Sequence, residues 1–70
     1  MPVVKVIELV GQSKQSWEDA VRQAVAEAAR TIRNIQGVEV LNWTGEVDGQ
    51  GNLTAYRADV NVAFLVDENR

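Results

Sequence analysis

The segment Leu53–Val66, with the sequence LTAYRADVNVAFLV, decides the fold. Its side chains alternate in character, and one set is apolar or small: Tyr56, Ala58, Val60, Val62, Phe64 and Val66. The alternate positions carry Arg57, Asp59 and Asn61. Because successive side chains point to opposite faces of a sheet, this alternation predicts a long β-strand with one apolar face and one polar face.

A turn and a second strand precede this segment. Asp48–Asn52 (DGQGN) predicts a turn, since Gly and Asn tolerate positive φ angles. Val38–Val47 predicts a strand, and Gly45 within it predicts a bulge or a sharp bend. The two strands and the turn between them therefore predict a long hairpin.

The N-terminal half predicts a strand and a helix. Val3–Val10 is rich in β-branched residues and ends at Gly11, which indicates a strand with apolar residues on both faces. A helix of about five turns is predicted to begin after Ser16, which resembles an N-cap, with Ser13 as the alternative cap. Its apolar stripe comprises Trp17, Ala20, Val21, Ala24, Val25, Ala28, Ile32 and Ile35. Gly37 is predicted to end the helix in the left-handed conformation.

These elements predict an α+β fold of order β-α-β-β, in one domain over residues 1–70. The helix connects the first two strands, and the third strand is antiparallel to both. The simplest sheet has the strand order first-third-second, is antiparallel and wraps around the helix. Such a sheet leaves its edges and one face uncovered, and uncovered strand edges favour pairing with another chain.

Composition points to a homo-oligomer. The chain has 70 residues, no Cys and no His, so disulfides and a structural zinc site are excluded as stabilising elements. Its hydrophobic fraction of 46% is more than one small core hides. The seven basic residues are scattered over a chain of net charge −3, which argues against nucleic-acid binding. No apolar stretch approaches the ~20 residues of a membrane span, and no signal peptide is evident, so a cytoplasmic location is predicted.

The residue types favour binding over catalysis. Without His and Cys, the commonest general base and the thiol nucleophile are missing, so an enzyme is not expected. Two side chains are the candidates for function. Arg57, on the polar face of a central strand, is predicted to form an intersubunit ion pair, for example with Asp59 of a neighbouring chain, or to contact a ligand. Trp43 is predicted to make a subunit contact or to offer a stacking platform, whereas Trp17 is expected in the core.

The chain resembles the dodecins, small β-α-β-β proteins whose twelve copies form a hollow shell. The order and spacing of five segments carry the resemblance: Lys5–Gly11, Ser16–Val21, Arg33–Ile35, Val38–Val40 and Tyr56–Phe64. The resemblance implies a homododecamer without catalytic activity that stores or sequesters a small molecule. In many dodecins that molecule is a flavin such as FMN or riboflavin.

Two positions depart from the flavin-binding pattern of these proteins. The Trp that stacks on the flavin ring falls on Gly37, which offers no aromatic face. The Gln that hydrogen-bonds the ring edge falls on Arg57, which cannot accept a hydrogen bond. The resemblance is therefore closer to dodecins that lack the stacking Trp, among which is a calcium-associated type. An Arg in a pocket also suits an anionic ligand.

Three hypotheses follow. The first is a dodecin-like shell that binds a small molecule or an ion, with the flavin site altered at Gly37 and Arg57. The second is a true flavin-storage protein in which another group, such as Trp43 of a neighbouring chain, replaces the missing Trp. The third is a structural assembly without a ligand.

Overall fold

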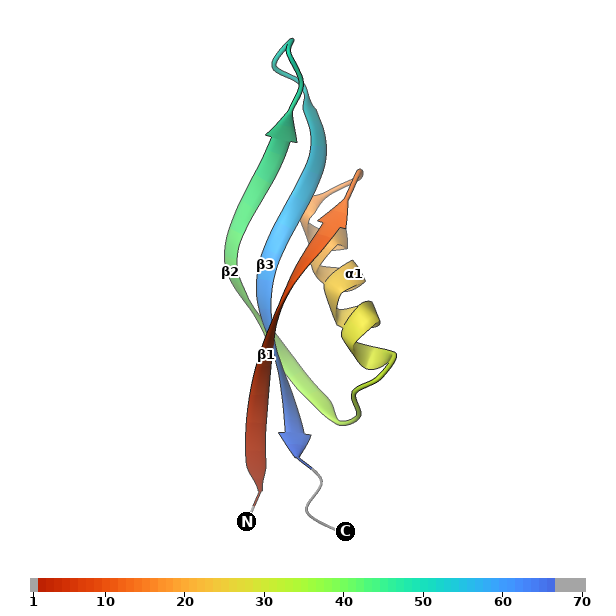
Figure 1. The fold of residues 1–70 in the computed structure, drawn as a ribbon, viewed down its shortest axis with the longest axis vertical. Coiled ribbons are helices and arrows are strands. Elements are labelled where there is room, and N and C mark those ends of the chain that lie inside the picture. Colours follow the sequence, from red (N-terminus) through yellow and green to blue (C-terminus); the bar gives the residue numbers. More distant parts are fainter. Residues whose placement is uncertain (1, 67–70) are drawn as a thin grey trace.

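The computed structural model describes residues 2–66. Strand β1 (Val3–Ser13) is followed by helix α1 (Trp17–Ala29), strand β2 (Ile35–Val47) and strand β3 (Leu53–Val66). The three strands form one antiparallel sheet in the order β1-β3-β2, and α1 lies across one face of it (Figure 1). The predicted α+β class, the order of the elements and the central position of β3 are confirmed.

The pairing register places β3 against both neighbours over nearly its whole length. β1 pairs with it from Val3 opposite Val66 to Ser13 opposite Tyr56 without interruption. β2 pairs with it through register shifts, the last of which lies between Glu46 and Val47. The irregularity predicted at Gly45 is therefore displaced, and Gly45 itself pairs with Tyr56.

Small residues bring the helix close to the sheet. Ala20, Ala24 and Ala28 are buried, and they pack on a central row of β3 that comprises Ala58, Val60 and Val62. Gly11 on β1 is the tightest point, because a Cβ atom there would lie 1.9 Å from the carbonyl oxygen of Ala20. The helix therefore lies at a distance from the sheet that only these small residues permit.

The helix begins where predicted but ends earlier. The amide of Asp19 donates to Oγ of Ser16 at 3.0 Å, so Ser16 is the N-cap. Asp19 in turn accepts from Oγ of Ser13 at 2.7 Å, which ties the end of β1 to the first turn of α1. The predicted five turns are wrong, because α1 has 13 residues and Ile32 and Ile35 lie beyond it.

The connection from α1 to β2 shows why the helix stops. The last turn tightens, since the amide of Thr31 donates to the carbonyl of Ala28. Asn34 then takes a positive φ of 63°, and its carbonyl accepts from the amide of Leu65 at 2.9 Å, which attaches the connection to β3. Gly37 was predicted to end the helix; it lies instead within β2 and has no positive φ, so this prediction is wrong.

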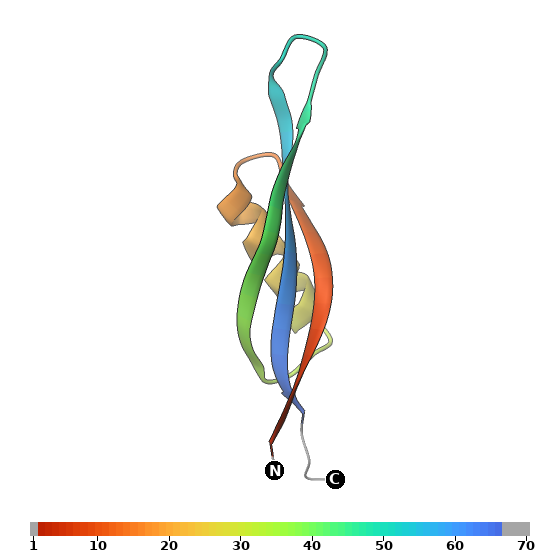
Figure 2. The ribbon, with the colours of Figure 1, turned by 90° about the vertical axis from the view of Figure 1, so that its left-hand side faces the viewer.

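The described residues form an elongated body of 54 × 19 × 13 Å. We call the sheet face opposite α1 the open face, since no element covers it (Figure 2). Residues 46–55, which we call the arm, extend past the last residue of β1 as a two-stranded hairpin (Figure 1). Its turn is as predicted, with Gly51 at φ 86° and the Asp48 carboxylate accepting from the amides of Gln50 and Asn52. Over residues 2–66, no helix has the length and apolar character needed to cross a membrane.

Candidate functional site

The three residues predicted to bind a ligand do not converge within one chain. Trp43 lies on the same sheet face as α1, because it pairs with the buried Ala58 and its ring contacts Trp17. Arg57 lies on the open face. Gly37 pairs with Ala63, six residues along β3 from Arg57, which corresponds to about 20 Å at 3.3 Å per residue. Any single site that contains Gly37 and Arg57 therefore needs more than one copy of the chain.

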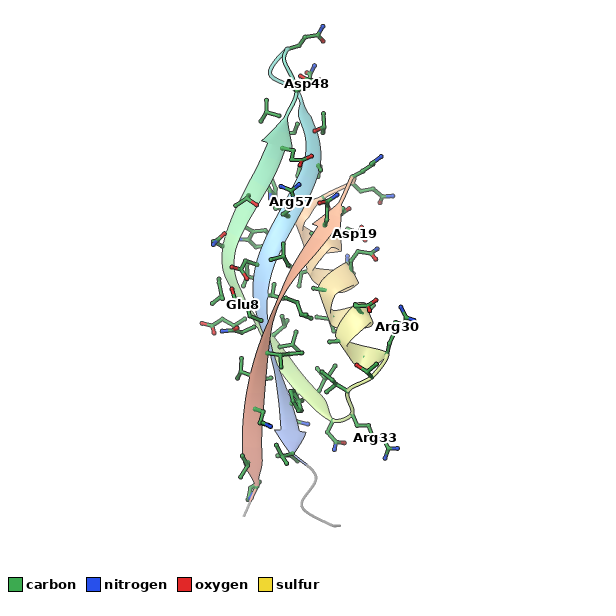
Figure 3. All side chains as sticks on the ribbon, viewed as in Figure 1. Glu8, Asp19, Arg30, Arg33, Asp48 and Arg57 are labelled. Carbon is green, nitrogen blue, oxygen red and sulfur yellow. The ribbon has the colours of Figure 1, made fainter. Side chains whose placement is uncertain are left out.

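Arg57 joins all three strands on the open face. Its Nε donates to Oε1 of Gln12 on β1 at 2.9 Å, and its guanidinium forms an ion pair with Glu46 on β2 (Figure 3). The Arg57 side chain is 34% exposed, and that of Glu46 is 50% exposed. The structure thus pairs Arg57 with a carboxylate of its own chain, whereas the sequence suggested Asp59 of a neighbour. Its charge is balanced, which weakens the case for an anion site.

Two carboxyl groups lie together further along the open face. Glu8 on β1 points away from α1 (Figure 3). It pairs with Asn61, and Asp59 lies two residues from Asn61 on β3, diagonally across from Glu8. A hydrogen bond with Asp59, electrostatic repulsion from it and partial desolvation all raise the pKa of Glu8. Oδ1 of Asp59 is buried and has no hydrogen-bond partner in the described part of the chain. The pair is therefore able to hold a shared proton or to contact a cation.

Three aromatic rings meet on the other face, where α1 begins. We call the site between the indoles of Trp17 and Trp43 the aromatic corner. The two ring centroids are 6.4 Å apart, and the ring planes are inclined by 87° to each other. Tyr56 lies behind Trp17, with centroids 4.7 Å apart and an inclination of 74°. Trp17 was expected in the core, yet it is only partly buried and donates from Nε1 to the carbonyl of Thr44 at 2.7 Å.

Sequence reasoning missed the partners that these side chains find. The pairs Arg57–Glu46 and Glu8–Asp59 each join two different strands, so only the strand register reveals them. The sequence contains neither His nor Cys. Among residues 2–66, no three Asp, Glu, His or Cys side chains gather in a group that could hold a metal ion.

The fold and these side chains define a class of very small β-α-β-β proteins with a largely uncovered sheet. The model of the family described as Dodecin matches residues 3–67, and the chain belongs to the dodecin family. The resemblance read from the sequence is thereby confirmed at the level of the family.

Known relatives agree with this assignment. The chain is 38% identical to a protein named calcium dodecin of Mycobacterium tuberculosis over 64 residues, covering 91% of this chain and 89% of the relative. It is 33% identical to a dodecin of Thermus thermophilus over 66 residues, covering 94% of each. A crystal structure of a Thermus thermophilus protein matches with a TM-score of 0.91 at 32% identity, over 99% of this chain and 100% of that one. The crystal structure of the Mycobacterium tuberculosis calcium dodecin matches with a TM-score of 0.80 at 32% identity, over 97% and 96% of the two chains.

Proposed function

We propose that this single-domain chain is the subunit of a cytoplasmic homo-oligomeric shell, a dodecamer by analogy with its family, which binds a small molecule or an ion without catalysis. The exposed apolar side chains of the open face carry the proposal. Val4, Val6 and Val10 on β1 are 55%, 54% and 61% exposed, although strand valines are ordinarily buried. Full burial of a Val side chain contributes roughly 1.5 kcal/mol, so covering this face with other copies is favourable.

The arm provides a second argument for assembly. Val47 and Leu53 face each other across its two strands and are 60% and 46% exposed. A two-stranded hairpin without a packing partner is marginally stable in water. The extended shape of the chain therefore fits a subunit whose surfaces are completed by neighbours.

The proposal includes a flavin site that is altered at two positions. Nothing lies within 4 Å of the place where a Cβ of Gly37 would be, so no side chain of the same protomer replaces a stacking ring there. Arg57 already donates to Gln12 and Glu46, and a guanidinium has no acceptor atom for an imide N–H. Flavin storage of the usual kind is accordingly the second hypothesis, and a structural assembly without a ligand is the third.

A calcium-binding version of the shell is favoured by one specific observation. The Glu8–Asp59 pair places two carboxyl groups on the open face, with Oδ1 of Asp59 lacking a partner. Ca²⁺ takes 6–8 oxygen ligands, more than this pair supplies. Copies that meet across the open face would bring further carboxylates to it, and a relative of 38% identity is named calcium dodecin.

The test combines size, flavin fluorescence and calcium on one purified sample. Light scattering is expected to give a particle of many subunits, riboflavin fluorescence is expected to stay unquenched, and Ca²⁺ is expected to raise the melting temperature relative to chelator. The variant Val6→Asp is expected to dissociate the particle, whereas Gln23→Asp, which adds the same charge on the exposed side of α1, leaves its size unchanged. A folded monomer in the unmodified protein would refute the shell, and strong quenching of riboflavin would replace the altered site by true flavin storage.

A further inference from the structure

A pocket of about 350 Å³ lies beyond the end of α1, and we call it the basic pocket. Three parts of the chain line it: the start of β1 with Lys5, the connection from α1 to β2 with Ile32 and Arg33, and the end of β3 with Phe64. Sites for small molecules have volumes of roughly 300–1,000 Å³. The size of the basic pocket therefore matches a small molecule of a few heavy atoms.

The basic pocket carries a positive charge. Lys5 and Arg33 both line it, and no carboxylate of residues 2–66 does so. Three other arginines form ion pairs with glutamates of the same chain, whereas Lys5 and Arg33 form none with any residue of that range. Arg33 extends outward from the connection at the rim of the pocket (Figure 3). The pocket thus offers two cationic groups to an anion.

The walls of the basic pocket are held in place by strand pairing. Lys5 pairs with Phe64, and both lie on the side of the sheet that carries α1, since Val62 on the same face of β3 is buried in the core under the helix. The connection is attached to the same part of β3, because the carbonyl of Asn34 accepts from the amide of Leu65 at 2.9 Å. The apolar wall and the two cations therefore keep their relative positions without a ligand.

The helix end beside the pocket does not exclude an anion. The carbonyl end of a helix carries a partial negative charge, which disfavours an anion within the last turn. The carbonyl of Ala28 in this turn accepts from the amides of Thr31 and Ile32 at 3.2 and 3.0 Å, so it is satisfied. The amides of Arg33 and Asn34, which follow, have no acceptor within residues 2–66. The partial charge of the helix end is thereby reduced, and the two full positive charges outweigh it.

We propose that the basic pocket binds a small carboxylate with an apolar body. The two carboxylate oxygens meet one cation each, the ammonium of Lys5 and the guanidinium of Arg33, in charge-assisted hydrogen bonds. The apolar body lies against Ile32 and Phe64. This inference rests on the proposed function of binding a small molecule, and it names a site and a class of ligand for that function. Neither the valines of the open face nor the arm lines the basic pocket, so the contacts proposed for assembly do not use it.

The test is a calorimetric titration of the assembled protein with hexanoate at neutral pH, where this carboxylate is charged. Acetate, which lacks most of the apolar body, and hexanol, which lacks the charge, are each expected to bind about tenfold more weakly. Lys5→Gln and Arg33→Gln are each expected to weaken hexanoate binding about threefold to fivefold, the scale of one partly exposed ion pair. Lys14→Gln removes the same charge from an exposed residue outside the pocket and is expected to leave the affinity unchanged.

The outcomes that would overturn the site are distinct. Hexanoate that does not bind, or that binds equally to the unmodified protein and to both pocket variants, would refute it, as would hexanol that binds as tightly as hexanoate. An equal loss in Lys14→Gln would show a general effect of net charge. A smaller particle in light scattering of Lys5→Gln would assign the pocket to a subunit contact and would also overturn the proposal. Because particle size and the response to Ca²⁺ are measured separately, the proposed shell function can stand when the basic pocket fails.

Discussion

Replacing Gly11 by Ala tests the close packing of α1 on the sheet. The new Cβ would lie 1.9 Å from the carbonyl oxygen of Ala20 and 3.0 Å from the Cβ of Ala24, whereas ordinary contact begins near 3.4 Å. The clashing group belongs to the helix backbone, so no rotation of a side chain relieves it. The helix must withdraw by about 1.5 Å, the difference between 1.9 Å and 3.4 Å.

The cost of this withdrawal follows from the core that it opens. Overpacking a well-packed site costs typically about 1–3 kcal/mol and occasionally more. Here the movement also separates the buried Ala20 and Ala24 from β3, so we expect a loss of about 3 kcal/mol or more. The total stability of a 70-residue domain is about 4–10 kcal/mol at 0.05–0.15 kcal/mol per residue, so this single methyl group removes a large fraction of it.

The assay is urea unfolding of Gly11→Ala beside Gly37→Ala at one chain concentration, since assembly is linked to stability. Gly37 is a matched control, because it also lies in a strand, has no positive φ and has nothing within 4 Å of a new Cβ. Gly37→Ala is expected to be neutral or to stabilise by about 0.4–1 kcal/mol. At a slope near 1 kcal/mol per molar urea, the midpoints should differ by about 3 M. Midpoints within about 0.5 M of each other would show that the helix does not approach β1 as closely as described.

Three further outcomes are expected. Ser16→Ala removes the acceptor for the Asp19 amide, so urea denaturation should show a free energy of unfolding that is lower by about 1 kcal/mol. An unchanged denaturation midpoint would show that Ser13 suffices as the cap. The pKa of Glu8 is higher in the folded than in the unfolded chain, so protonation of Glu8 stabilises the fold fully below its ordinary pKa of 4.5, and this stabilisation is lost as the pH rises through the raised pKa. Glu8→Gln should therefore remove this decline from a series of melting temperatures measured at increasing pH. An equal decline in both proteins would contradict the expectation. Glu46→Gln should lower the free energy of unfolding by less than about 1 kcal/mol, because both partners of the ion pair between Glu46 and Arg57 are partly exposed. The loss should vanish at high salt, which screens the ion pair. A loss that does not depend on salt would point to packing instead.

The alternation of side chains in β3 was sufficient to predict the centre of the fold. A strand with apolar or small side chains at six alternate positions needs another layer of structure over that face. In the structure this layer is α1, and both edges of β3 are paired. The alanine row of the predicted helix agreed with this, since only small side chains allow close helix–sheet contact. The strand order followed from the connections, because the helix joins the first two strands and the third strand is antiparallel to both.

The end of the helix could not be predicted by the same means. Ile32 and Ile35 lie beyond the end of the helix but continue its apolar spacing, because they pack against the same core as the helix does. The sequence signal at Gly37 was also misleading, since Asn34 takes the left-handed conformation three residues earlier. Asn adopts this conformation more often than most other residues with a side chain, so a nearby Gly does not by itself locate the end of the helix.

The candidate site residues could be identified from the sequence, but their contacts could not. Trp43 and Arg57 stood out as unusual residues for their strands, but their surroundings depend on contacts between residues far apart in the sequence. Trp17 lies 27 residues from the carbonyl of Thr44 that holds it, and Arg57 lies 45 residues from Gln12. The aromatic corner is therefore a product of the β2 register, and only the folded chain reveals it.

The residues proposed to hold the shell together and the residues proposed to depart from the flavin-binding pattern are different side chains. On the open face, Val4 and Val6 lie near the start of β1, whereas Gln12, which accepts a hydrogen bond from Arg57, lies near its end. On the other face, the aromatic corner lies where α1 begins, before the alanine row that packs on the sheet. A side chain at position 37 would have nothing within 4 Å in the protomer, so the residue type there does not affect the packing of the core. Gly11, by contrast, is fixed by packing, because a Cβ there would lie 1.9 Å from the carbonyl oxygen of Ala20 in the alanine row.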